Sequence, residues 1–205
     1  KPADMPMAYG ANNHGSIVQI KDQWYIFYHR HTNGSWYSRQ GCAEPISIAE
    51  DGSIEQVEIT SCGLNGGPLA GQGEYPAYLA CHLFTDEPSM YVGGDAFPKV
   101  MQDGKDGDEE IGYVGNVQNS ATIGFKYFDM KNVKKIRVTM RGYISGNIEV
   151  RLTWDGDVLA SLPIEFTNVW ETYESEIEIP DGIHSLYFTF RGDGNGALKS
   201  FELLV

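Results

Sequence analysis

The 205-residue sequence lacks several features that would place it in a particular class of protein. No apolar run approaches the roughly 18 residues that a membrane-spanning helix needs, so no membrane partner is expected. The three cysteines, Cys42, Cys62 and Cys81, have no CxxC spacing, which argues against a zinc cluster or a disulfide framework. One disulfide plus one free thiol, or three buried thiols, both stay open. We favour three thiols, because free cysteine is among the most buried residue types.

Positive charge is also scarce. The chain has 15 Lys and Arg residues against 28 Asp and Glu residues, which gives a net charge of -13. This charge repels phosphate backbones, so we expect no nucleic-acid partner and instead a neutral ligand or a cation. No basic, apolar leader opens the sequence, and its first residue is Lys1. We therefore expect a segment that was processed or cut from a longer protein; its localisation stays open, with a secreted bacterial parent as one option.

The residues that are abundant favour β-structure. The chain has 24 Gly, 12 Tyr and 9 Phe residues and no convincing amphipathic helix pattern. Residues 12–60 contain apolar stretches separated by turn pairs such as Asn33-Gly34 and Asp51-Gly52, which predicts a meander of about four strands. Residues 61–84 are rich in Gly and Pro, and we expect irregular chain held on a surface by its aromatic side chains. "TDEPS", residues 85–89, is the best linker.

Beyond residue 90, apolar and polar residues alternate with period two, which is typical of antiparallel sheets with one wet face. The apolar positions of "KKIRVTM", "NIEVRLTW" and "SLYFTF" are Ile136, Val138, Met140, Ile148, Val150, Leu152, Trp154, Leu186, Phe188 and Phe190. We expect these residues, Trp154 included, to form the core of a β-sandwich. By contrast, a single meander over residues 12–60 cannot bury both of its faces. It needs neighbours that this chain does not contain.

Two resemblances fit this imbalance. "GANNHGSIVQIKDQWYIFYHRHT", followed by "SRQGCAEPISIAEDGSIEQVEIT", resembles the end of the catalytic domain of glycoside hydrolase family 43. Those enzymes are five-bladed β-propellers that cut arabinose- and xylose-containing polysaccharides. "FTNVWETY" and the closing "SFELLV" resemble a family 6 carbohydrate-binding module. The implied fold is all-β: one propeller blade and its clasp in residues 1–84, a linker in residues 85–89 and a jelly-roll β-sandwich in residues 90–205.

The first resemblance implies roles for two residues of the blade. His14 matches a histidine that points to the propeller axis and helps to hold a central cation or water cluster. Arg39 matches an arginine at the floor of the active site, where its planar fork suits sugar hydroxyls or a carboxylate. A surface ion pair is the alternative role for Arg39. His29 and His31 share one face of a regular strand, so a metal chelate with His14 is a further alternative.

Glycoside hydrolysis requires an acid and a base or nucleophile, which are usually carboxylates. In the resembled family these residues lie in the earlier blades, which are absent here. The acidic residues of the N-terminal part match no catalytic motif and are expected in turns or on polar strand faces. We therefore assign no catalytic residue and expect the chain to be inactive alone. It can complete an active site when the missing blades come from the parent chain or a second chain.

The second resemblance implies a sugar-binding cleft. Trp170 matches the family's tryptophan, Tyr113 its early aromatic residue, and Asn195 substitutes for a C-terminal asparagine that is missing in register. A structural Ca²⁺ is also open, with candidate ligands Asp95, Asp103, Asp108 and Glu202. The expected function is polysaccharide recognition in the service of arabinoside or xyloside hydrolysis. The alternatives are a structural cap without a ligand and a metal-binding β-protein.

Overall fold

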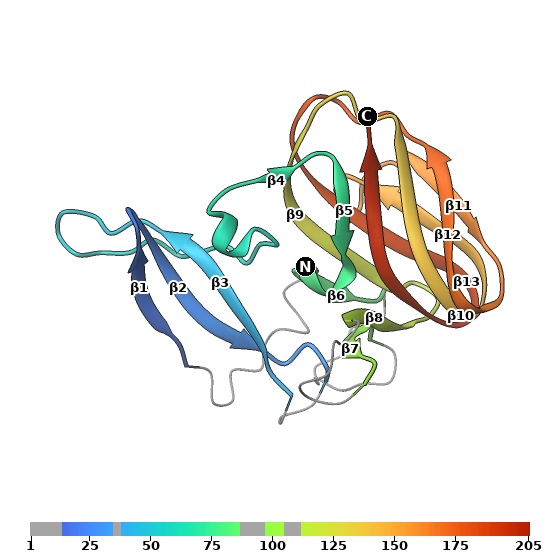
Figure 1. Cartoon of the computed structure of the whole chain (residues 1–205), viewed down its shortest axis with the longest axis horizontal. Helices are drawn as coiled ribbons and strands as arrows, with labels where there is room; N and C mark the ends of the chain where they lie inside the picture. The colour runs from blue at the N-terminus through green and yellow to red at the C-terminus, as the bar shows by residue number, and fades with distance from the viewer. Residues whose placement is uncertain (1–13, 35–37, 87–96, 105–111) are drawn as a thin grey trace.

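The computed structural model describes residues 14–34, 38–86, 97–104 and 112–205. A small sheet, formed by the N-terminal strands, projects from a larger β-sandwich (Figure 1). The described residues contain no α-helix, only the short 3-10 helices η2 (Gly63–Asn65) and η3 (Ala77–Leu79). Neither is long or apolar enough to cross a membrane. The fold class is therefore all-β, as the sequence predicts.

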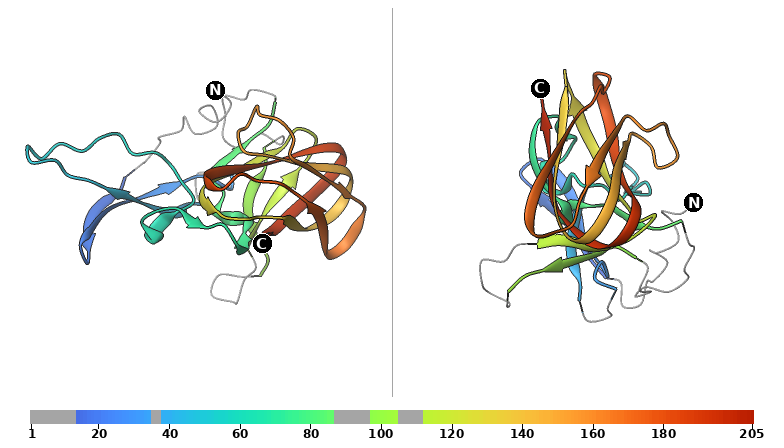
Figure 2. Two further views of the ribbon diagram at one scale, coloured as in Figure 1. Left: turned by 90° about the horizontal axis from the view of Figure 1, so that it is seen from above. Right: turned by 90° about the vertical axis from the view of Figure 1, so that its right-hand side faces the viewer.

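The N-terminal sheet consists of three antiparallel strands in the order β1 (Ser16–Ile20), β2 (Gln23–Arg30) and β3 (Gln40–Ile46). Strand β1 lies at the edge, and all five of its residues are exposed. Its apolar residues Ile17 and Val18 are 45% and 43% exposed. Figure 2 shows the sheet extending sideways from the sandwich. The described residues thus leave the outer edge of this sheet uncovered, as expected for a blade without its neighbour.

The predicted fourth strand of the meander is not formed. After β3, the chain makes only an isolated bridge between Ile48 and Ile54, around the turn at Gly52. The following residues bind elsewhere: Glu58 pairs with Lys126 of the sandwich. Thr60 bonds to the Glu44 side chain of β3 and does not extend its backbone ladder, so the sheet of the described residues stops at three strands.

The sandwich is built around two long strands, β10 (Lys135–Arg151) and β13 (Gly182–Leu204), and β10 pairs along its whole length with residues 187–204 of β13. Both bend near glycines, and there the backbones are so close that a Cβ on Gly146 would lie 2.2 Å from the carbonyl oxygen of Arg191. Each strand continues through the bend from one layer to the other (Figure 1). The other strands are β7 (Lys99–Gln102), β8 (Gly112–Val117), β9 (Thr122–Met130), β11 (Ala160–Ile164) and β12 (Thr167–Glu176).

The core lies between the two layers. Most of the predicted apolar positions are fully buried: Ile136, Val138, Met140, Ile148, Val150, Leu186, Phe188 and Phe190. Leu152 is half-buried and packs against them. The prediction is wrong for Trp154, which is 40% exposed. Strand β10 ends at Arg151, so the period-two pattern no longer fixes the direction of a side chain three residues later.

Residues 61–84, called the connecting segment here, are more regular than predicted. They contain three short strands, β4 (Leu69–Ala70), β5 (Gly73–Pro76) and β6 (His82–Phe84). Strands β4 and β6 pair with β9, and β5 pairs with β13. This segment therefore joins the sheet of the sandwich, across the boundary predicted at residues 85–89. Its aromatic anchor is Tyr75, whose ring lies 5.0 Å from that of Phe128.

All three cysteines are free thiols, as favoured from the sequence. Cys62 and Cys81 are buried, whereas Cys42 is partly exposed. Burial raises the pKa of the Cys81 thiol to about 11. The prediction of buried thiols therefore holds for Cys62 and Cys81, which act as small apolar residues of the interior, and not for Cys42.

Candidate functional site

The first candidate site is a cluster of three histidines and Arg39 on the small sheet. The ring centroids of His14 and His29 are 4.9 Å apart, and those of His29 and His31 are 5.3 Å apart. Partial burial, followed by the positive charges of Arg39, His14 and His31, lowers the pKa of His29. The structure thus brings His14 and Arg39 to one place, and both are exposed.

The histidines do not form the alternative metal chelate. Their rings meet at steep angles, 64° and 87°, in edge contacts. In the part of the chain that the structure describes, no group of three or more His, Cys, Asp or Glu side chains could hold a metal ion. A cation held by His14 together with residues of other blades stays a prediction.

Two buried charged residues fix the sheet to the connecting segment. Arg30, only 5% exposed, donates from Nη1 to the carbonyl of Ala80 at 3.0 Å and from Nη2 to that of Cys81 at 2.8 Å. Glu44, also buried, accepts hydrogen bonds from the Tyr28 hydroxyl and from the backbone and side chain of Thr60. The expectation that the acidic residues here are solvated is therefore wrong for Glu44. No pattern in the sequence marks either residue as buried.

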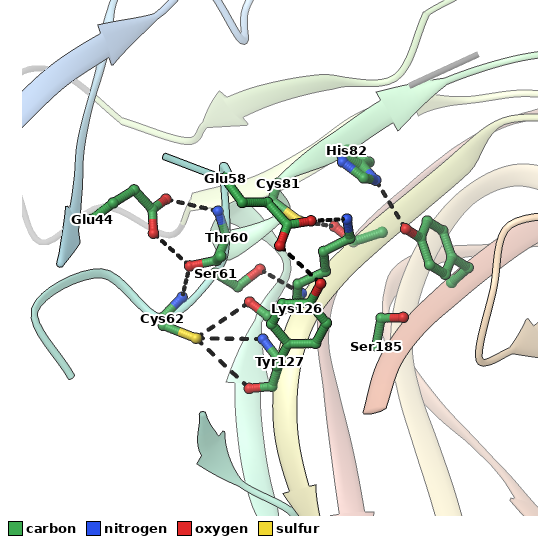
Figure 3. A network of polar contacts seen from close by, with 12 residues as sticks. Glu44, Glu58, Thr60, Ser61, Cys62, Cys81, His82, Lys126, Tyr127 and Ser185 are labelled. Carbon is green, nitrogen blue, oxygen red and sulfur yellow. Dashed lines mark hydrogen bonds and ion pairs between the residues drawn. The ribbon is translucent and has the colours of Figure 1, made fainter. Parts of the chain in front are cut away.

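A second polar network joins residues 58–82 to the sandwich (Figure 3). Glu58 accepts from Lys126 Nζ at 2.6 Å and from the Tyr127 hydroxyl at 2.9 Å. Burial and the neighbouring Glu58 carboxylate raise the pKa of Tyr127 to about 12. Nearby, His82 Nδ1 lies 3.0 Å from the Tyr187 hydroxyl. These contacts hold the two parts of the chain in a defined arrangement.

The second candidate site is a cleft of about 540 Å³ on the sandwich. Strands β7, β8, β10 and β13 and the start of β12 supply its walls. Its lining residues are Lys99, Met101, Tyr113, Gly115, Asn116, Arg141, Gly142, Tyr143, Asn168, Asn195, Gly196 and Ala197. Two of the three predicted sugar-binding residues, Tyr113 and Asn195, therefore line one cleft. The third, Trp170, lies against Tyr113, with ring centroids 5.6 Å apart and planes at 63°.

Arg141 fills the angle between these two rings. Its guanidinium carbon lies 4.2 Å from the centroid of Trp170 and 5.2 Å from that of Tyr113. Asp103 holds it, because both carboxylate oxygens accept from Nη2, at 3.0 and 2.9 Å. A sugar ring cannot stack between Tyr113 and Trp170 while Arg141 stays there. Sequence reasoning missed this residue, which lies on the polar face of an alternating strand.

The exposed aromatic surface of the cleft comes instead from Tyr143, which sequence reasoning also missed. Tyr143 is 76% exposed and stacks on Phe166, itself 55% exposed, with centroids 4.6 Å apart. Next to it, the side-chain amide of Asn195 donates to Asn116 Oδ1 at 3.0 Å. Flat aromatic faces beside fixed amides are the groups that bind sugar rings and their hydroxyls. In the sequence, Tyr143 is marked only by its place between Gly142 and Gly146, where β10 bends.

The described candidates for Ca²⁺ do not fit a calcium site. Asp103 is paired with Arg141, and Glu202 accepts from Arg137 at 3.1 Å. Asp95 and Asp108 lie outside the described residues. A structural calcium stays a prediction that depends on those two residues.

The sandwich and its cleft define the class to which this protein belongs. Residues 100–203, half of the chain, match the model of the carbohydrate-binding module family 6, so the chain belongs to that family. The whole chain is similar to a xylosidase/arabinosidase of Thermoclostridium stercorarium: the two are 58% identical over 209 aligned positions, which cover 99% of this chain and 44% of that protein. An arabinoxylan arabinofuranohydrolase of Paenibacillus polymyxa is 26% identical, over 94% of this chain and 31% of its own length. The chain thus spans less than half the length of these relatives.

Solved structures show the same arrangement. A glycoside hydrolase family 43 arabinoxylan arabinofuranohydrolase from Bacillus subtilis superposes with a TM-score of 0.61 at 21% identity, over 98% of this chain and 42% of its own. A family 6 module from Clostridium cellulolyticum, solved with xylose, has a TM-score of 0.52 at 17% identity over 66% of this chain and 99% of its own. The likeness to a propeller end followed by a β-sandwich module, inferred from the sequence, is confirmed.

Proposed function

We propose that this chain is the part of an arabinoside- or xyloside-hydrolysing enzyme that closes the catalytic propeller and binds the polysaccharide. The observation that carries the proposal is the uncovered strand β1, in a chain whose whole length is 58% identical to part of a xylosidase/arabinosidase. A three-stranded sheet with an exposed edge strand gains stability from neighbouring strands. The partner is therefore the remainder of a propeller, which supplies the catalytic carboxylates.

The cluster of His14, His29, His31 and Arg39 supports a place near the active site. His14 and Arg39 are exposed, and both lie near His29. Arg39 can hold a substrate hydroxyl or orient a carboxylate of another blade, because its guanidinium presents several donors in one plane. In this proposal both residues shape the active-site floor, and neither takes part in bond cleavage.

A chimeric enzyme tests this role. In it, the chain replaces the matching 44% of the Thermoclostridium relative. We expect the chimera to hydrolyse aryl arabinosides or xylosides and the isolated chain to be inactive. Arg39→Met in the chimera should lower kcat/KM at least about tenfold, which corresponds to about 1.4 kcal/mol of transition-state stabilisation. Lys131→Met, at an exposed ion pair on the sandwich, is the control and should keep full activity. Turnover by the isolated chain, or an unchanged Arg39→Met chimera, would contradict the proposal.

For the module, we propose that Tyr143 is the main sugar-stacking residue. Tyr143→Ala should weaken binding of xylo-oligosaccharides or arabinoxylo-oligosaccharides about tenfold, because a large exposed ring is lost from the cleft. Isothermal titration calorimetry measures this change. Trp154→Ala removes another exposed aromatic ring, three residues beyond the end of β10, and should leave the affinity unchanged. An equal loss of oligosaccharide affinity in both variants would contradict the assignment of this cleft as the sugar-binding site.

A structural cap is the second candidate function. The position of Arg141 between Tyr113 and Trp170 favours it, because the most enclosed aromatic pair is already occupied. The contacts of Glu58 with Lys126 and Tyr127 also suit a module that stabilises its neighbour. Absence of any heat of binding with neutral and acidic oligosaccharides alike would establish the cap and exclude recognition.

A further inference from the structure

Arg141 is a charged side chain in the wall of the candidate sugar cleft. The faces of Trp170 and Tyr113 hold its guanidinium group, at 4.2 and 5.2 Å from the ring centroids. Such cation-π contacts fix the plane of the guanidinium without using its hydrogen-bond donors. Both oxygens of Asp103 bind the same nitrogen, Nη2, so this ion pair does not use Nε or Nη1. The group is therefore oriented and still has donors to offer.

The charge of the cleft is opposite to that of the protein. Lys99 and Arg141 are the charged side chains among the described lining residues, and none of these residues is acidic. The chain as a whole carries a net charge of -13. Asp103 offsets the charge of Arg141, and the remaining positive charge of Lys99 favours a ligand that carries negative charge.

The ion pair between Arg141 and Asp103 is weak enough for a carboxylate on a ligand to replace Asp103. The Arg141 side chain is 30% exposed and that of Asp103 is 43% exposed. Ion pairs of this exposure contribute little to stability, whereas a bidentate bond from arginine to a carboxylate is among the stronger hydrogen-bonding arrangements. A carboxylate on a ligand can therefore bind the unused donors beside Asp103, or take its place.

The rest of the cleft suits a sugar that bears such a carboxylate. Tyr143 offers an exposed ring, and the amides of Asn168 and Asn195 line the same cleft. We propose that this cleft recognises an acidic sugar, a uronic acid unit on a xylan-type chain, with Arg141 and Lys99 binding its carboxylate. This proposal rests on the proposed carbohydrate-binding function of the module and names the ligand class of that site.

Calorimetry of the whole chain with two matched ligands tests the proposal. One ligand is a xylo-oligosaccharide substituted with glucuronic acid, and the other is the neutral xylo-oligosaccharide of the same length. We expect the acidic ligand to bind at least about tenfold more tightly and to lose this advantage at high salt, because ion pairs are screened. It should also change the fluorescence of the chain through Trp170, which contacts Arg141.

Three variants separate recognition from a structural role. Arg141→Met should remove the preference for the acidic ligand and leave the neutral affinity within about twofold. Asp103→Asn should keep or raise the acidic affinity, since a competing carboxylate is gone; a purely structural ion pair would make both variants behave alike. Arg137→Met, on the same strand but outside the lining, is the matched control and should keep the preference.

The outcomes are distinct for the two proposals. Equal affinity for both ligands, or a preference that survives Arg141→Met, overturns the acidic-sugar proposal and leaves carbohydrate recognition standing. Binding of neither ligand by a folded chain overturns both. Binding of free glucuronate with the same dependence on Arg141 would confirm that the carboxylate is the recognised group.

Discussion

Replacing Phe201 with alanine is expected to lower the free energy of unfolding by about 3–5 kcal/mol, the usual cost of truncating a buried phenylalanine. Phe201 lies in the middle of the sandwich, with its ring centroid 4.7 Å from that of Phe125 and 5.0 Å from that of Phe188. It also contacts Tyr75, the aromatic anchor of the connecting segment. The substitution therefore opens a cavity between the layers and loosens the segment that carries the small sheet. Guanidinium unfolding followed by tryptophan fluorescence measures the change.

Ile183→Ala is the control for this variant. Ile183 lies on the same strand, β13, but is exposed, so its truncation should change the free energy of unfolding by less than about 0.5 kcal/mol. Similar losses for the two variants would show that the sandwich is not packed around Phe201.

Replacing Arg30 with methionine is expected to cost about 2–4 kcal/mol and to free the small sheet from the connecting segment. The carbonyls of Ala80 and Cys81 each lose a charged donor, and such bonds contribute about 1.5–3 kcal/mol apiece. Part of this loss is regained because methionine has no charge to desolvate. Lysine should not restore the loss fully, because its single ammonium cannot reproduce a planar fork.

Limited proteolysis together with chemical unfolding distinguishes the two consequences of the Arg30 variant. Cleavage within β1 to β3 should become faster, while the sandwich stays resistant. Lys131→Met is the control, because its pair with Asp129 is on the surface and contributes little. A variant that unfolds like the wild type and shows unchanged cleavage would mean that Arg30 does not fix the sheet.

The sequence predicts the sandwich well because its alternation reports burial directly. Ile136, Val138 and Phe188 alternate with polar residues over regular strand, so their common face could be identified. The same rule fails at Trp154, where the strand has already ended. It also fails after residue 54, because contacts of Glu58 with distant Lys126 and Tyr127 override the local preference for a fourth strand.

The resemblance named residues that the structure brings together, and their roles stay predictions. It placed His14 near Arg39 and Tyr113 near Trp170, and the structure brings each pair into one region. It could not reveal Arg141, because the contacts of this residue join strands far apart in the sequence. Burial of Arg30 was equally invisible, since its partners are backbone carbonyls about 50 residues away.

Strand β7 has a consequence for how the two parts of the molecule work together. The Val100 amide donates to the Thr32 carbonyl at 2.9 Å, and Asn33 Nδ2 donates to the Val100 carbonyl at 2.7 Å. On either side of Val100, Lys99 and Met101 line the cleft. If the cleft binds a polymer as proposed, that polymer would lie at a constant distance and orientation from the loop that follows β2. The fold would then fix the distance between the bound sugar and the residues that face the propeller. One binding event would therefore let the propeller reach only a limited set of positions along the polymer.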